Sequence, residues 1–397
     1  MELYILDQQF RRIHVIDKFK SLVWTERWQQ VGDFVLDTES TVRDRSWLRP
    51  GNFLSILESN RVMQVETVEE KLDANGGLVL QAKGRSLEFA ILGARVLANA
   101  DFTNSPILFR NQPYDVVRNM VWRILRDLNL SPNDAFPNLT LTSGPFPLGD
   151  IPFPQRTIRW KVDGPTQLLT AIEEVCKLYS MGYRILREVD GYDLYFNVYT
   201  GNNRTTQQTK HEPVLFSSKL HNLRSTTHFQ TIEGYANVAY VFSENVGVEK
   251  VAQNVDPNVS GYRRRVVATT AQIEQGETDI PDALDDQGEK ALYSTRAEEL
   301  FDGELGEHVE YTYGVHYGLG DLVEMRDTDG VTTRQRVTEQ IFVADAEGDR
   351  SYPTLSKGEV SSLDTWLSRA GDTDTPDPDV ATGGSWAAET TDTWKDL

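Results

Sequence analysis

The side chains that could carry chemistry are few and widely spaced. His308 and His316 flank Glu310, but eight residues separate the histidines on a segment expected to be a strand, so they need not converge on a metal ion. Cys176 is the single cysteine and lies on the apolar face of a predicted helix, which favours a buried structural thiol over a nucleophile. We therefore predict no metal site, no catalytic residue and no cofactor.

Motifs of the common enzyme classes are missing from the sequence. There is no His-Glu-x-x-His zinc motif, no Gly-x-x-x-x-Gly-Lys phosphate loop and no Gly-x-Ser-x-Gly nucleophile elbow. Gly318-Leu319-Gly320 lies in a predicted β segment, without the strand-to-helix context of a dinucleotide-binding loop. A glycosidase pair of carboxylates would leave no local motif, so a hydrolase stays open as an alternative. The prediction is a protein that is not an enzyme.

Composition narrows the class of protein further. The 397 residues carry 40 Lys and Arg against 60 Asp and Glu, a net charge of −20, and 39% are hydrophobic, which is typical of a folded chain. No apolar run reaches the roughly 18 residues of a membrane helix, so we expect no integral membrane insertion. The acidic balance disfavours ordinary nucleic-acid binding, in which Lys and Arg neutralise phosphates.

The first hundred residues have the pattern of strands separated by turns. Asp7-Gln8-Gln9 and Asn75-Gly76-Gly77 predict hairpin turns, and residues 87–97 could be helical. Trp24 and Trp28 lie four residues apart in one expected strand, so we predict that both rings lie on one buried face.

The middle of the chain changes to a helical period. Apolar residues recur at three- and four-residue steps from Pro113 to Leu128 and again from Pro165 to Tyr179, which predicts two helices, the second stopped by Gly182. A hairpin with its turn at Asp190-Gly191 follows.

Strand character returns in the run that starts at Tyr235. Residues 271–310 hold 13 acids and two bases, and Pro281 to Phe301 has a helical pattern. Arg263-Arg264-Arg265 is expected to pair with this acidic stretch, and strands resume from Tyr311 to Val343.

Two distant segments share a local pattern. Gly51-Asn52 opens a strand whose returning partner begins at Arg61-Val62, and Gly320-Asp321 opens a strand whose partner begins at Arg336-Val337. Gly32-Asp33 again precedes a strand. Glycine permits the turn, and Asp or Asn can bond the local backbone. The pattern is either a hairpin that many β proteins use or the sign of a small barrel duplicated near each end.

The C-terminal residues 368–397 lack periodicity and hold seven acids and two bases, a composition that cannot form a core of its own. Trp386 and Trp394 stand in this segment, and aromatic residues are favoured at the centres of interfaces. We predict that these two rings dock the segment on another protein or on a neighbouring subunit.

Five segments, in the same order, resemble the tail-hub minor tail proteins of long-tailed, non-contractile phages of Actinobacteria. They are the strand around Trp24 that leads to Gly32-Asp33, the Gly84-Arg85-Ser86 element, the hairpin that follows Gly182, and the closing Gly320-Asp321 and Arg336-Val337 strands. The resemblance covers residues 1–350 and marks these residues as structural motifs.

The resemblance implies an α+β, mostly β fold like that of phage baseplate hubs. Two small β-barrels would carry an inserted α+β domain and a second acidic, partly helical insertion. The implied division is 1–100 for the first barrel, 101–210 for the α+β domain, 211–247 with 306–350 for the second barrel, 248–305 for the acidic insertion and 351–397 for an extended acidic tail.

The resemblance also implies a homotrimer at the tail tip of the virion, joining a six-fold tail tube to a three-fold central fibre. Its partners would be the distal tail protein ring, the tape-measure protein and the central tail fibre protein. DNA would pass through without specific binding, because an acidic lumen repels phosphate; the alternative is that the net charge serves only to keep the chain in solution. The alternatives are a host-surface carbohydrate-binding module, since Trp and Tyr can stack on sugars, and a cell-wall hydrolase.

Overall fold

The computed structural model describes most of the chain up to Ser356. The described residues are 1–72, 77–98, 106–127, 133–189, 192–220, 222–243, 246–252, 255–271, 273, 280–296, 298–305, 311–326 and 332–356. Within them the chain is mostly β, as predicted. No helix in these ranges is long and apolar enough to cross a bilayer.

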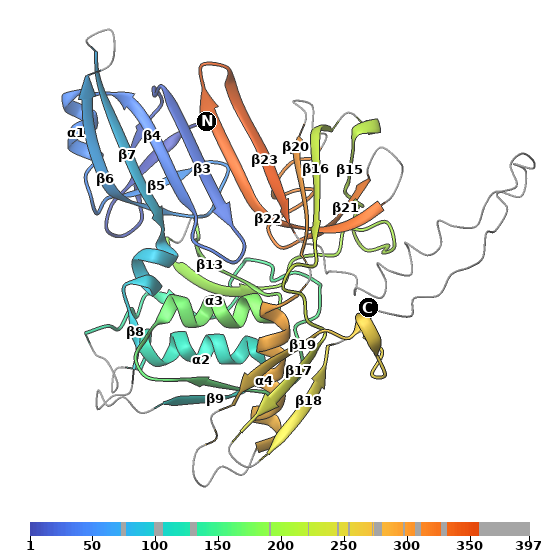
Figure 1. The fold of residues 1–397 in the computed structure, drawn as a ribbon. Helices are drawn as coiled ribbons and strands as arrows, with labels where there is room; N and C mark the ends of the chain where they lie inside the picture. Colours follow the sequence, from blue (N-terminus) through green and yellow to red (C-terminus); the bar gives the residue numbers. More distant parts are fainter. Residues whose placement is uncertain are drawn as a thin grey trace, which may run out of the picture.

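One large sheet forms the upper part of the molecule (Figure 1). Its hydrogen-bonded order is β15-β21-β22-β3-β4-β7-β6-β5-β1-β2, and β23 also pairs with β22. The strands are β1 (Leu3–Leu6), β2 (Arg12–Ile16), β3 (Ser21–Arg27), β4 (Asp33–Glu39), β5 (Phe53–Ile56), β6 (Met63–Leu72), β7 (Leu78–Ser86), β15 (Leu215–Ser217), β21 (Leu322–Arg326), β22 (Thr332–Asp345) and β23 (Gly348–Ser356). The short helix α1 (Val42–Trp47) connects β4 to β5.

Strand β22 joins two lobes of this sheet. Its first residues pair with β21, and residues 339–344 pair with β3. The first lobe, β1 to β7, packs on an apolar cluster that includes Trp24 and Phe34. The second lobe, β15 with β21 to β23, packs on a separate cluster that includes Phe216 and Met325. The two barrels predicted as separate units therefore share one continuous sheet, while each lobe keeps a core of its own.

The two tryptophans of the first strand region lie in different cores. Trp24 and Trp28 are both buried, as predicted. Trp24 belongs to the cluster of the first lobe, whereas Trp28 belongs to that of the second lobe. The prediction of one shared face is wrong because β3 ends at Arg27, so Trp28 lies beyond the regular strand.

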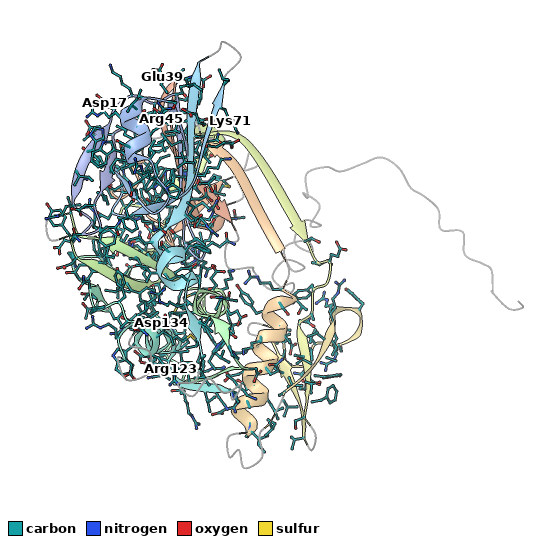
Figure 2. The ribbon with its side chains drawn as sticks, turned by 90° about the vertical axis from the view of Figure 1, so that its left-hand side faces the viewer. Asp17, Glu39, Arg45, Lys71, Arg123 and Asp134 are labelled. Atoms are coloured by element: carbon teal, nitrogen blue, oxygen red, sulfur yellow. The ribbon has the colours of Figure 1, made fainter. Side chains whose placement is uncertain are left out.

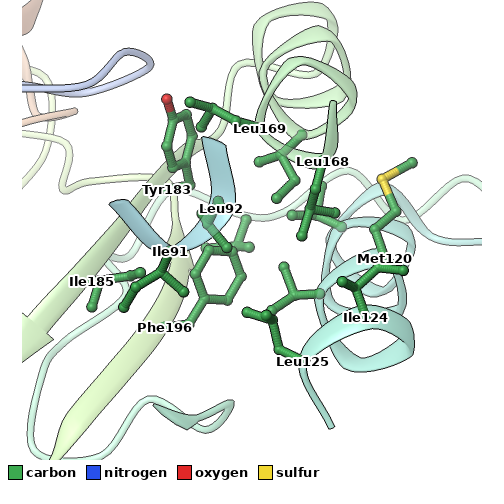
Figure 3. Packing of buried hydrophobic residues seen from close by; sticks show 14 of the residues in the cluster. Ile91, Leu92, Met120, Ile124, Leu125, Leu168, Leu169, Tyr183, Ile185 and Phe196 are labelled. Carbon is green, nitrogen blue, oxygen red and sulfur yellow. The ribbon is translucent and has the colours of Figure 1, made fainter. Parts of the chain in front are cut away.

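The α+β domain lies below the first lobe (Figure 1). Its elements are the π-helical turn η1 (Phe89–Gly93), β8 (Val96–Leu97), β9 (Ile107–Asn111), α2 (Pro113–Leu125), β10 (Leu139–Thr140), β11 (Ile158–Val162), β12 (Thr166–Gln167), α3 (Leu168–Leu178), β13 (Gly182–Arg187) and β14 (Leu194–Tyr199). Figure 3 shows Met120 and Leu125 of α2, Leu168 of α3 and Phe196 of β14 meeting in its core. Both predicted helices and the β13–β14 hairpin are thereby confirmed.

The stop of the second helix differs from the prediction. Ser180, with a φ of 50°, adopts the left-handed conformation after α3, whereas Gly182 begins β13. A Cβ on Gly182 would lie 2.1 Å from Cδ1 of Trp28, so this glycine permits a close approach to a ring and does not end the helix.

The acidic insertion lies beside the α+β domain and is reached through the paired strands β16 and β20 (Figure 1). The elements from Ser218 to Leu305 are η2 (Ser218–Leu220), β16 (Leu223–Thr231), β17 (Val238–Phe242), β18 (Gly247–Val251), η3 (Gly261–Arg263), β19 (Val266–Thr270), α4 (Ile280–Ser294) and β20 (Glu298–Leu305). Strands β18, β17 and β19 form a three-stranded sheet, which we call the insertion sheet.

Four details of this half of the chain correct the sequence-based expectation. The helix predicted to Phe301 ends at Ser294, because residues 298–305 pair with β16 instead. The strand after Tyr235 lies in the insertion sheet, so the predicted boundary after residue 247 cuts through it. Strand β23 continues the large sheet to Ser356, beyond the predicted end of the second barrel at 350. Tyr311 to Leu319 forms turns closed by a bridge between Tyr313 and Tyr317, not a strand.

Candidate functional site

The repeated sequence pattern corresponds to a repeated turn. Gly51 has a φ of 92°, its N–H donates to the Val65 carbonyl at 2.8 Å, and the Val65 N–H donates to the Asn52 carbonyl at 2.8 Å. Gly320 has a φ of 87° and makes the same pair of bonds. Its N–H donates to the Val337 carbonyl at 2.8 Å, and the Val337 N–H donates to the Asp321 carbonyl at 3.0 Å. One copy lies in each lobe. The positive φ explains why glycine occupies both positions, since residues with a Cβ are strained in this conformation.

The structural register of the repeat differs from the one read in the sequence. Val337 of the second turn corresponds to Val65 of the first, not to Val62. The Arg-Val pairs that aligned the two segments are therefore not equivalent positions.

The second turn lies where the second lobe meets the α+β domain, a region that we call the junction. A Cβ on Gly320 would lie 2.7 Å from Nε1 of Trp28, and a Cβ on Gly201 would lie 2.2 Å from the carbonyl carbon of Gly320. Gly149 approaches Gly201 just as closely, because a Cβ on Gly149 would lie 2.1 Å from the Gly201 carbonyl oxygen. Backbones and one indole ring thus pack without room for a methyl group.

Asp321 fastens the junction with its carboxylate. It accepts bonds from the N–H groups of Asn202 at 2.7 Å and Gly318 at 2.9 Å, and from Nε of Arg204 at 3.0 Å. Burial raises the pKa of Asp321, while the bond from Asn202 and the charge of Arg204 act in the opposite direction. Arg336 adds two bonds from its Nη1, to the carbonyls of Thr200 at 2.9 Å and Gly320 at 2.6 Å, and its guanidinium lies over the Trp28 ring.

The other predicted motif residues gather at one end of the first lobe. Gly32 and Ser86 bond reciprocally: the Gly32 N–H donates to the Ser86 hydroxyl at 3.1 Å, and the Ser86 N–H donates to the Gly32 carbonyl at 2.9 Å. A Cβ on Gly84 would lie 1.8 Å from the Gln64 carbonyl oxygen, at a bulge of the β6–β7 pair. Arg85 pairs with Glu66 at 2.8 Å, and Asp33 pairs with Arg27 at 2.5 Å. These five residues, Gly32, Asp33, Gly84, Arg85 and Ser86, therefore fix strand ends.

A buried ionic cluster connects the first lobe to the α+β domain. Nη1 of Arg61 lies 3.0 Å from Glu88, and its Nε lies 3.7 Å from Glu26. Glu88 also accepts the N–H of Ile185 in the α+β domain at 2.8 Å, and Glu26 accepts Nε1 of Trp24 at 3.2 Å. Burial alone would lower the pKa of Arg61, but the charges of Glu88 and Glu26 outweigh the effect of burial, so the pKa of Arg61 is raised.

Sequence reasoning missed this cluster, apart from Trp24. Arg61 was singled out only as the start of a returning strand, and Glu88 falls in a segment chosen for its apolar pattern. Arg and Glu inside otherwise apolar runs are the one sign of this cluster in the sequence, but each lies far in the sequence from the residue that it pairs with.

The candidate chemical residues do not assemble into a reactive site. Burial raises the pKa of the Cys176 thiol, which lies in the apolar core of the α+β domain. Nδ1 of His316 accepts the N–H of Thr312 at 2.8 Å, while His308 and Glu310 lie outside the described residues. Among the described residues, no group of three His, Cys, Asp or Glu could hold a metal ion.

The acidic helix α4 uses its carboxylates for docking. Arg156 of the α+β domain contacts Asp285 at 2.6 Å and Glu289 at 2.8 Å, and it also bonds Asp286. The prediction that Arg263-Arg264-Arg265 would pair with the acidic stretch is not met by Arg264, which pairs with Glu249 at 2.6 Å. The basic partners of α4 also include Lys250 of β18 and Arg110 of β9, and all of them are distant in the sequence, so no local pattern indicated these pairs.

The side of the molecule drawn in Figure 2 carries charges of both signs. Asp17, Glu39, Arg45 and Lys71 stand on the first lobe. Arg123 and Asp134 stand on the α+β domain below it. This side is therefore not uniformly acidic. The predicted partner-binding rings, Trp386 and Trp394, lie outside the described residues.

Comparisons with known proteins agree with the expected fold. The model of the family described as Siphovirus ReqiPepy6 Gp37-like protein matches residues 2–355. The comparison with curated proteins gave no match.

Three solved structures of tail proteins are similar to nearly the whole chain. The tail protein from Neisseria meningitidis MC58 is 10% identical, with a TM-score of 0.53 over 89% of this chain and 96% of that one. The 43 kDa tail protein of prophage MuSo2 from Shewanella oneidensis is 12% identical, with a TM-score of 0.53 over 89% and 97%. The prophage tail protein gp18 from Listeria monocytogenes EGD-e is 10% identical, with a TM-score of 0.52 over 94% and 99%. The fold is thus that of phage tail proteins.

Proposed function

The chain belongs to the family of Siphovirus ReqiPepy6 Gp37-like proteins, and we propose that it is the structural hub at the tip of a long-tailed phage tail. The observation that supports this role best is the repeated Gly-Asx turn, one copy in each lobe of a single sheet. A chain with two similar lobes can present two similar surfaces. The proposed hub works by holding them in fixed positions, not by catalysis.

The symmetry argument follows from these two lobes. Three copies in a closed ring would present six similar surfaces to a six-fold tail tube or distal tail ring, while the opposite side stays three-fold for a central fibre. The buried cluster of Arg61, Glu26 and Glu88 and the packed glycines of the junction would keep the lobes from rotating against the α+β domain. Rigid lobes are what a symmetry adaptor needs.

The proposed partners follow from this position. They are the distal tail protein ring, the tape-measure protein and the central fibre protein, the last of these held through Trp386 and Trp394. The net charge of −20 would let DNA pass along the channel without specific binding. The proposed location is the virion tail tip, with assembly in the host cytoplasm.

Two measurements together test the proposed role. Light scattering on the purified chain should give three times its mass of 45.0 kDa. Class averages of virions that carry a labelled chain should place the label at the tail tip. A monomeric mass together with label along the tail tube or on the capsid would contradict the proposal.

A further inference from the structure

The insertion sheet has two faces, and helix α4 covers one of them. Ala239 and Val241 of β17 pack on Leu284 and Leu292 of α4. Gly288 lets the helix approach closely, because a Cβ there would lie 3.2 Å from a methyl group of Val241. The alternation along β17 therefore sends its remaining side chains to the opposite face.

Val238, at one end of that opposite face, is buried against Val255 and Val259, whereas the remainder of the face carries exposed apolar side chains. Tyr240 and Phe242 of β17 are 36% and 50% exposed, Val266 of β19 is 43% exposed, and Tyr262 in the turn before β19 is 83% exposed. We call these four residues the aromatic face. All four are among the large hydrophobic residues that the described structure exposes. A concentration of this kind marks a surface that binds something.

The charge around the aromatic face is basic. Residues 261–266 carry three arginines and no acid. Nη2 of Arg264 donates to the Tyr240 hydroxyl at 3.2 Å and to Glu249 at 2.6 Å, which places a guanidinium at the edge of the rings. An occupant that complements this face combines apolar rings with carboxylates.

The chain itself carries a segment of this composition. Residues 359–379 hold six acids and one base, and their apolar residues, Val360, Leu363, Trp366 and Leu367, come first. The last described strand, β23, ends close to the insertion. Thr354 at the end of β23 lines the same cavity, of about 370 Å³, as Tyr293 and Arg296 at the end of α4. The 41 residues that follow Ser356 could span well over 100 Å if extended, at about 3.3 Å each.

We propose that residues 359–379 bind the aromatic face of their own chain. Trp366 and its apolar neighbours would cover Phe242 and Tyr262, and the acids that follow would pair with the arginines beside them. Trp386 and Trp394 come later in the sequence, so they would remain available for a partner. The proposal does not depend on the hub role.

Photo-crosslinking of the full chain tests this inference. A photoreactive phenylalanine analogue at Tyr262 should crosslink to a peptide within residues 359–379. In a mixture of isotopically labelled and unlabelled chains, the joined peptides should carry the same isotope. The analogue at Leu108, which is 51% exposed on β9, is the matched control and should not capture that peptide.

Variants separate specific binding from chance proximity. Trp366→Ala should lower the crosslink yield at Tyr262 at least five-fold. Trp122→Ala, which removes an exposed ring on α2, should leave the yield unchanged. In the unmodified chain, about 0.5 M salt should reduce the crosslink yield, because salt at this concentration screens attractions between surface charges. A variant with four acids exchanged for Asn should give a yield that does not depend on salt; the four are Asp372, Asp374, Asp377 and Asp379. Capture of another protein, of another copy, or of a different segment would overturn the proposal, and so would a yield that Trp366→Ala does not change.

Discussion

Replacing Gly320 by Ala tests whether the junction is packed without free space. The change has a matched control in Gly51→Ala, because the two glycines have φ values of 87° and 92° and make the same pair of backbone bonds. Forcing Ala into this left-handed conformation costs about 1–2 kcal/mol at either position. This backbone contribution cancels when the two variants are compared.

The surroundings of the two glycines differ. A Cβ on Gly51 meets no atom within 4 Å, whereas a Cβ on Gly320 would lie 2.7 Å from Nε1 of Trp28. The Trp28 ring cannot withdraw easily, because it also lies against Gly182 and under the guanidinium of Arg336. Overpacking in a filled core costs about 1–3 kcal/mol, so Gly320→Ala should destabilise by that much more than Gly51→Ala.

Urea unfolding followed by Trp fluorescence measures this difference. The unmodified chain and both variants are compared at equal concentration, with the free energy of unfolding taken from midpoint and slope. We expect a clearly lower midpoint for Gly320→Ala than for Gly51→Ala. Equal midpoints would show that the junction yields to a methyl group, and would refute its description as a rigid connection.

Three further changes probe other parts of the structure. Trp24→Ala should cost about 3–5 kcal/mol, because it empties a fully buried site in the core of the first lobe; a urea midpoint close to that of the unmodified chain would count against the assigned core. Arg61→Met should destabilise the fold by about 3–5 kcal/mol, because it leaves Glu88 and Glu26 buried without a counter-charge. Adding Glu88→Gln should recover part of this loss, and a double variant less stable than the single one would disprove the pairing. Burial raises the pKa of Asp286 to about 6, above its unfolded value, so its contribution to stability is complete below about pH 4 and is lost as the pH rises through 6. Asp286→Asn should therefore flatten this part of a plot of urea midpoint against pH. Parallel plots for the variant and the unmodified chain would contradict the assignment to Asp286.

Local patterns predicted the elements better than they predicted their partners. The apolar period of α2 and α3 and the hairpin of β13 and β14 depend on neighbours within a few residues, and all were found where the sequence indicated. The strand after Tyr235 was also recognised, but not its sheet, because alternation along a strand does not reveal which strands pair with it.

The candidate site shows the same division. Gly320 and Asp321 were singled out because a Gly-Asp pair is a recognisable turn. Their contacts with Trp28, Asn202 and Gly201 join positions more than a hundred residues apart, so no spacing rule could give them. Arg61 and Glu88 are closer in sequence, but polar residues inside apolar runs do not show whether they will be paired or exposed.

The central claim is that each chain contributes two similar lobes to one ring at the tail tip. A single-particle reconstruction of virion tail tips, computed without imposed symmetry, tests it most directly. We predict three copies of the chain, with the turns at Gly51 and Gly320 alternating at six similar positions around the channel. Six copies in the ring, or a ring in which only one lobe of each chain contacts the tail tube, would contradict it.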